Sequence, residues 1–182
     1  MAEHKKIGIM GGTFNPIHFG HLLLAETAFH QFNLDEILIM PTKNPYYKKI
    51  SNSVTEEDRV AMAELAIEDN VHFQLSKEEL NREGTTYTVE TLSHLRVKHP
   101  GYEYYFIMGA DSLYHIESWK DPEKILEMAT IVVAGRAAAS RYVCCPASDC
   151  KKSIKSFALS MFFAPLMIAE ANPTLVVPSS QN

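Results

Sequence analysis

Cysteine, basic charge and long hydrophobic runs are scarce in this chain of 182 residues, and each scarcity excludes a class of protein. The longest apolar segment, Phe157 to Ile168, is too short for a membrane span and is interrupted by Pro165. A net charge of −5 without a basic stripe disfavours nucleic acid as a partner. The first residues, MAEHKK, lack the apolar region of a secretory signal, so we expect a cytoplasmic protein without a membrane partner.

The three cysteines lie close together, between Cys144 and Cys150. Their number and spacing suit neither a disulfide framework nor a zinc knuckle. We therefore expect free thiols, as in a reducing compartment. Hydrophobic residues make up 46% of the chain and charged residues 21%, which is ordinary for one globular domain of this length.

Short apolar segments alternate with segments of helical spacing along most of the chain. Strands are predicted over residues 7–10, 36–40, 71–75, 104–108 and 130–134. Helices are predicted around Ala25, Ala28, Phe29 and Phe32, from Thr55 through Met62, Leu65 and Ala66, over 86–99, and after Asp121-Pro122. This alternation predicts an α/β fold with a Rossmann-like, doubly wound parallel sheet and right-handed crossovers.

Local signals predict where several helices begin. Thr55 with Asp58 three residues later is typical of an N-cap, and Asp121 before Pro122 is typical of another. A threonine within Thr85–Thr88 is expected to cap the helix that follows.

Polar and glycine-bearing segments follow four of the predicted strands. They are Gly11–His21, the loop after Pro41, Gly109–Asp111 and Gly135-Arg136. Because ligands of parallel α/β sheets bind at the carboxyl ends of the strands, we expect these segments to surround one site.

The first of these segments has the chemistry of a phosphate site. Gly11 and Gly12 let a ligand approach the backbone, and Pro16 stiffens the loop. His18 and His21 lie three residues apart at a predicted helix start, where imidazoles and backbone N–H groups can bind an anion. The alternative is that both histidines are structural.

The string GGTFNPIHFGH, from Gly11 to His21, resembles the signature of the HxGH nucleotidyltransferase superfamily and, in this extended form, of the nicotinate-nucleotide adenylyltransferases. The resemblance covers about residues 6–136. It implies a nucleotidyltransferase type of sheet and transfer of the adenylyl group of ATP to nicotinate mononucleotide, with release of pyrophosphate. The attacking phosphate is already anionic, so positioning and charge stabilisation would carry the catalysis, with Mg²⁺ accompanying ATP.

The resemblance also implies roles for individual residues. His18, His21 and Lys48 would be catalytic, although Tyr47 stands where the family has histidine. The residues implied in ATP binding are Gly11, Gly12, Thr13, Phe14, His18, His21, Gly109, Asp111 and Arg136. Those implied in nicotinate mononucleotide binding are Asn15, Thr86, Tyr87, Thr88 and Trp119. Arg59 also matches a family position, but an exposed helix arginine is the simpler interpretation.

From Ala137 the composition changes to alanine, serine, cysteine and proline, with few charges. The family's ISSTxIR motif, whose side chains hold the ATP phosphates, does not occur; the one Ser-Ser pair is Ser179-Ser180. We divide the chain into a nucleotidyltransferase domain, residues 1–136, and an atypical segment, residues 137–182. Poor order is one expectation for this segment, and a changed reading frame is one explanation.

Three functions remain open at this point. The first is the adenylyltransferase with ATP and nicotinate mononucleotide as small-molecule partners. The second is a related HxGH enzyme with another acceptor, such as pantetheine phosphate, against which Thr86–Thr88 and Trp119 argue. The third is a nucleotide-binding homologue that does not turn over. A homo-oligomer is compatible with each.

Overall fold

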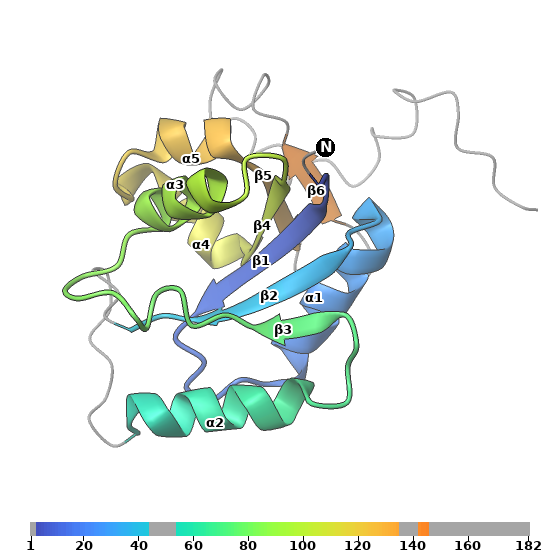
Figure 1. Ribbon diagram of the computed structural model, residues 1–182, viewed down its shortest axis with the longest axis vertical. Coiled ribbons are helices and arrows are strands. Elements are labelled where there is room, and N and C mark those ends of the chain that lie inside the picture. Colours follow the sequence, from blue (N-terminus) through green and yellow to red (C-terminus); the bar gives the residue numbers. More distant parts are fainter. Residues whose placement is uncertain (1–2, 44–53, 135–141, 146–182) are drawn as a thin grey trace, which may run out of the picture.

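The computed structural model describes residues 3–43, 54–134 and 142–145. In this part of the chain, one sheet has the strand order β3-β2-β1-β4-β5-β6 (Figure 1). The strands are β1 (Lys6–Gly12), β2 (Glu36–Pro41), β3 (Phe73–Leu75), β4 (Glu103–Gly109), β5 (Ala129–Ala134) and β6 (Tyr142–Cys145). The helices are α1 (Phe19–Phe32), α2 (Glu56–Ile67), α3 (Thr88–Lys98), α4 (Ala110–Tyr114), the short 3-10 helix η1 (Ile116–Ser118) and α5 (Pro122–Met128).

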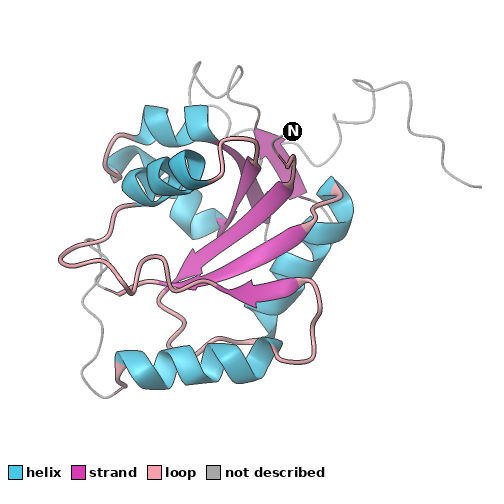
Figure 2. Ribbon diagram, viewed as in Figure 1, coloured by secondary structure: helices cyan, strands magenta, loops and turns pink. Residues whose placement is uncertain are grey.

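Helices cover both faces of this sheet (Figure 2). Buried residues of α1 and α2 pack on one face with Met10, Ile37 and Ile39. Buried residues of α3, α4 and α5 pack on the other face with Ile7 and Ile9. Pairing is parallel from β3 through β5, which confirms the predicted doubly wound α/β fold.

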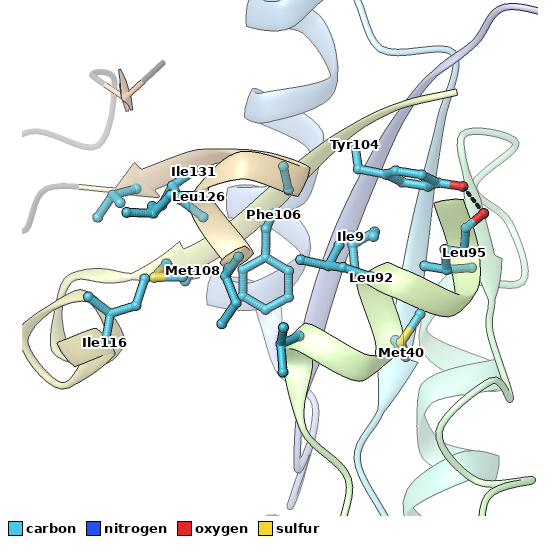
Figure 3. Packing of buried hydrophobic residues seen from close by; sticks show 14 of the residues in the cluster. Ile9, Met40, Leu92, Leu95, Tyr104, Phe106, Met108, Ile116, Leu126 and Ile131 are labelled. Atoms are coloured by element: carbon cyan, nitrogen blue, oxygen red, sulfur yellow. Dashed lines mark hydrogen bonds between the residues drawn. The ribbon is translucent and has the colours of Figure 1, made fainter. Parts of the chain in front are cut away.

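Alternation along the strands sends successive side chains to opposite faces. On β4, Tyr104 and Phe106 belong to the core under α3 and α5, whereas Ile107 belongs to the core under α1 (Figure 3). The Tyr104 hydroxyl donates a hydrogen bond of 2.9 Å to the Leu95 carbonyl, which satisfies its one polar atom. Burial raises the pKa of Tyr104 to about 12, so the phenol stays neutral.

Two predicted features of the first half of the chain differ from the structure. The buried face of α2 consists of Arg59, Ala63 and Ile67, and Leu65 is 67% exposed. The predicted apolar stripe on this helix was therefore wrong by about a quarter-turn, because Arg59 occupies a core position. The third strand is limited to residues 73–75, since Val71 lies 92% exposed before it.

Helix starts follow the predicted caps in two cases out of three. The Thr55 hydroxyl accepts from the Asp58 N–H, and the Asp58 carboxylate accepts from the Thr55 N–H, each at 3.1 Å. Asp121 precedes α5, with Pro122 at the first helical position. At α3 the N-cap is Tyr87, without a capping side chain, so the expectation of a threonine cap was wrong.

The strand β6 was not predicted. It pairs antiparallel with β5, opposing Tyr142 to Ala134 and Cys145 to Ile131. It lies within residues 137–182, whose atypical composition had given no strand signal. Among the described helices, none combines the length and apolar character that crossing a membrane requires.

Gly8 on β1 provides a test of the packing. An added Cβ there would clash with Ile37 Cδ1 and lie 3.0 Å from Leu34 Cδ1, both in the core. We expect Gly8→Ala to lower the free energy of unfolding by about 1–2 kcal/mol, because overpacking outweighs the gain from replacing a strand glycine. Urea denaturation measures this. Gly11→Ala on the same strand is the control, since its Cβ would make only a 3.8 Å contact; an equal loss in both variants would contradict the expectation.

Candidate active site

The site forms where the direction of the sheet order reverses. From β1 the chain moves outward to β2 and β3, then returns to place β4 on the other side of β1. Loops at the carboxyl ends of β1 and β4 therefore diverge to opposite faces. In sheets of this kind, ligands bind in the crevice between two such loops. Gly11-Gly12 and Gly109 stand at these two ends, which confirms that the first and third predicted segments meet.

The two histidines of the first loop lie against one another. His18 precedes α1 and His21 lies in its first turn, with ring centroids 3.8 Å apart and planes inclined by 28°. The edge of Phe14, which is buried, contacts the His21 ring at a centroid distance of 5.2 Å. Gly20 leaves room for this arrangement, because a Cβ there would be 3.1 Å from the His18 ring.

The hydrogen bonding of His21 determines which nitrogen carries its proton. Its Nδ1 accepts from the His18 backbone N–H at 3.3 Å. In the neutral ring the proton therefore resides on Nε2 and is available to a ligand. Burial, and secondly the neighbouring His18, lower the pKa of His21 to about 4. At neutral pH His21 is thus an uncharged hydrogen-bond donor at a helix start.

The start of α1 differs in charge from the start of α2. The first turn of α2 contains Glu56, Glu57 and Asp58, which compensate the positive end of its own dipole. The first turn of α1 contains no acidic residue. Its positive end is therefore left for an external anion, beside two imidazoles.

Arg59 connects the loops after β1 and β2. Its Nη1 donates to the Thr13 carbonyl at 2.6 Å and to the Thr42 carbonyl at 3.0 Å, and the side chain is 2% exposed. Burial lowers the pKa of its guanidinium from the usual value. The expectation of an exposed arginine was wrong, because these carbonyls provide polar partners inside the protein. Arg59 is a positioning residue for both loops.

The end of β4 offers open backbone. Gly109 is the N-cap of α4 with an ordinary φ of −76°, and an added Cβ would meet no atom within 4 Å. Neither its conformation nor its described neighbours require glycine, and the backbone here is open to close approach by another molecule. Asp111 lies exposed in the first turn of α4, two residues further on.

A second group of predicted residues gathers at the start of α3. Lys120 lies over the Tyr87 ring, 4.4 Å from its centroid, and donates to Glu90 at 2.6 Å, which brings the segment after Trp119 to this helix start. Trp119 is half-buried, edge-on to Phe106 of β4 at 6.0 Å. Thr86 is buried, and Thr88 is the first residue of α3. Among described neighbours, the Thr86 hydroxyl has no geometrically acceptable hydrogen-bond partner, although it lies near the buried Glu79 carboxylate.

The remaining predicted site residues lie in the loop after β1 or outside the described part of the chain. Asn15 is exposed in the loop between β1 and α1. Tyr47, Lys48, Gly135 and Arg136 lie outside the described residues. Sequence reasoning did not predict that Arg59 positions two loops or that Gly20 leaves room for the His18 ring. For Gly20, the available signal was a glycine between two histidines at a helix start.

Comparisons with known proteins identify the family of this chain. The family model for cytidylyltransferase-like proteins matches residues 9–180. The chain belongs to the cytidylyltransferase-like family. This range includes most of residues 137–182, whose separation as an atypical segment stays a prediction.

Within the cytidylyltransferase-like family, the chain is similar to nicotinate-nucleotide adenylyltransferases. It is 56% identical over 132 residues to a "probable nicotinate-nucleotide adenylyltransferase" of Lachnoclostridium phytofermentans, covering 72% of this chain and 66% of the relative. It is 46% identical over 132 residues to the protein of the same description from Bacillus cytotoxicus, covering 72% and 70%. The chain thus spans about two thirds of the length of these relatives.

Solved structures agree on the fold. A Plasmodium falciparum nicotinic acid mononucleotide adenylyltransferase complexed with NaAD superimposes with a TM-score of 0.64 at 24% identity, covering 71% of this chain and 64% of that one. A structure from Vibrio parahaemolyticus gives a TM-score of 0.61 at 23% identity, covering 75% and 77%. At this level of identity the likeness establishes the shared architecture of the sheet and its helices.

The lowered pKa of His21 predicts a pH effect on stability. The unfolded chain binds a proton on this residue near pH 6.5, and the folded chain binds it only near pH 4. The unfolded state is therefore favoured as the pH falls through this window. Between pH 6.5 and 4, we expect the free energy of unfolding to fall less in His21→Gln than in the unsubstituted chain. Urea denaturation at several pH values measures this difference. Parallel curves would refute the assignment.

Arg59 predicts a second, larger effect. We expect Arg59→Leu to lower the free energy of unfolding by about 2–4 kcal/mol, because two backbone carbonyls lose a buried cationic donor. Arg96→Leu is the matched control: its Nη1 also donates to two carbonyls, of Glu127 and Met128, but from an exposed position. Denaturation of both variants measures the difference, and similar losses would show that burial of Arg59 is unimportant.

Proposed function

We propose that this chain transfers the adenylyl group of ATP to nicotinate mononucleotide, giving nicotinate adenine dinucleotide and pyrophosphate. The observation that carries the proposal is the stacked pair His18 and His21 at the start of α1, whose first turn contains no acidic residue and which follows the glycine loop after β1. The descriptions of its relatives as nicotinate-nucleotide adenylyltransferases support the choice of substrates.

The reaction needs positioning more than proton transfer. A phosphate oxygen of the mononucleotide forms a bond to the α-phosphorus of ATP, and the bond from that phosphorus to pyrophosphate breaks. The nucleophile is already anionic at neutral pH, so no general base is required. His21 donates from Nε2, and His18 with the first N–H groups of α1 adds further donors where negative charge develops.

The loops on either side hold the two nucleotides. Gly109 and Asp111 suit the adenylyl ribose, because the glycine leaves space and a carboxylate accepts from hydroxyl groups. The start of α3, with Thr86 and Thr88, suits the nicotinate carboxylate, since a helix start favours an anion over a neutral amide. The Trp119 ring, which packs beside Phe106, would stack on the cationic pyridinium.

Mg²⁺ belongs to the proposal as the companion of ATP. Among the described residues, the only trio of side chains with metal-ligand geometry lies at the far end of α1. Asp111 is the acidic side chain beside Gly109 at the end of β4. A single carboxylate at this place suits a Mg²⁺ ion held mainly by phosphate oxygens and water. Such an ion would neutralise charge on the polyphosphate. A cytoplasmic location is part of the same proposal.

Pyrophosphate release tests the function. With ATP and Mg²⁺, we expect turnover with nicotinate mononucleotide and little with nicotinamide mononucleotide. His18→Ala should lower kcat by about 100-fold or more, since it removes a donor to the transition state. Gly109→Ala should raise the KM for ATP without loss of stability, because its Cβ meets no protein atom.

The alternatives give distinct results in the same assay. Turnover with pantetheine phosphate instead would identify another acceptor. Binding of ATP by the folded chain without pyrophosphate release, with any acceptor, would support a homologue that binds nucleotide without turnover. Either result would overturn the proposed reaction.

A further inference from the structure

A second histidine cluster lies at the other end of α1. Glu26 and His30 are one helical turn apart on α1, and His72 comes from the segment before β3. His30 Nε2 lies 3.0 Å from Glu26 Oε1, and His72 Nδ1 lies 2.9 Å from the same oxygen. One nitrogen or oxygen from each of the three side chains falls within 4.8 Å of the other two.

Neighbouring groups hold two of these side chains in place. The Asn70 Nδ2 donates to Glu26 Oε2 at 2.9 Å, and the Asn70 Oδ1 accepts from the His72 backbone N–H at 2.9 Å. The Phe29 ring stacks on the His72 ring at a centroid distance of 3.9 Å and an angle of 13°. Such outer partners are what orients the ligands of metal sites.

This cluster is remote from the adenylyl site. The His72 carbonyl accepts from the Ile37 N–H at 2.9 Å, which places it at the amino ends of β2 and β3. The nucleotide loops lie at the carboxyl ends. Along α1, the twelve residues from His18 to His30 correspond to about 18 Å. The cluster therefore takes no part in the proposed transfer reaction.

Two imidazoles and one carboxylate form a recurrent set of zinc ligands. Bonds of about 2.1 Å in a tetrahedron separate ligand atoms by about 3.4 Å. The two N–O separations, 3.0 and 2.9 Å, are close to this value, and the two nitrogens lie within 4.8 Å of each other. The side chains of Glu26 and His72 are 31% and 32% exposed and that of His30 is 66% exposed. Water can therefore reach a fourth position.

We propose that Glu26, His30 and His72 bind a late first-row divalent cation, with Zn²⁺ as the best match. Imidazole ligands favour Zn²⁺, Ni²⁺, Co²⁺ and Cu²⁺ over Mg²⁺ and Ca²⁺. On binding, the proton on each coordinating nitrogen moves to the other ring nitrogen or to solvent. The ion then links the last turn of α1 to the segment before β3 and stabilises the folded chain.

Thermal unfolding of the full chain with and without Zn²⁺ tests this site. We expect Zn²⁺ to raise the Tm of the unsubstituted chain, and Glu26→Gln and His30→Gln each to weaken the metal affinity by about tenfold or more and to reduce this rise. His94→Gln is the matched control. His94 has the same 66% exposure and a glutamate, Glu78, at 3.4 Å, but the third group there is Lys98 instead of a histidine.

A Co²⁺ titration separates this cluster from the three cysteines, which are alternative zinc ligands. Thiolate coordination gives an intense charge-transfer absorption that imidazole and carboxylate ligands do not. We expect Co²⁺ to give a spectrum without that band, of equal strength in the unsubstituted chain and in His94→Gln. The same spectrum should be weaker in His30→Gln. An equal Tm rise in all variants, a thiolate spectrum, or no metal effect in the unsubstituted chain would each overturn the proposal.

Discussion

The parallel pairing of β1 with both β2 and β4 is the constraint on which the site depends. Because β1 is central, its glycine loop lies beside the ends of both neighbours. The crossover from β1 to β2 places α1 on one face, and the segment after β4 leads toward the other, so the two loops leave the sheet in opposite directions. Backbone pairing sets this arrangement, and the side chains of Ile37 on β2 and Ile107 on β4 pack closely over Gly8. The position of the site is thus a consequence of strand order.

The electrostatics of the crevice follow from desolvation at a helix start. A charged imidazole beside the positive end of α1 would be repelled by the dipole and by the second ring. Neutral His21, fixed by its Nδ1 hydrogen bond, avoids this repulsion and still presents a donor. In the proposed reaction, an arriving triphosphate would bring the negative charge that the first turn of α1 lacks. His21 therefore adds no buried positive charge at the start of α1. The buried positive charge of Arg59, by contrast, is stabilised by two carbonyl oxygens.

Local patterns in the sequence predicted those features that depend on neighbours in the chain. Strand–glycine–helix order gave the β1 loop, and the Thr55 cap followed from residues three apart. Arg59 could not be placed correctly, since its partners Thr13 and Thr42 are 46 and 17 residues away. Helical periodicity alone predicted that Leu65 lies on the buried face of α2, but the helix is rotated so that Arg59 is buried instead. The convergence of loops was predictable from the fold class, while burial of polar groups needed the tertiary structure.

Helix α1 shows how one residue type acquires opposite preferences at its two ends. At its start, two imidazoles are stacked, the first turn contains no acidic residue, and the helix dipole adds positive potential, so the environment favours an anion. Toward its other end, Glu26, one turn before His30, adds a negative charge beside His30 and His72, and the dipole at the last turn is negative. Hydrogen bonds from Asn70 and the two histidines outweigh burial and lower the pKa of Glu26, which keeps the carboxylate ionised. Under the two proposals, histidine would therefore donate to phosphate at one end of α1 and offer a lone pair to a cation at the other.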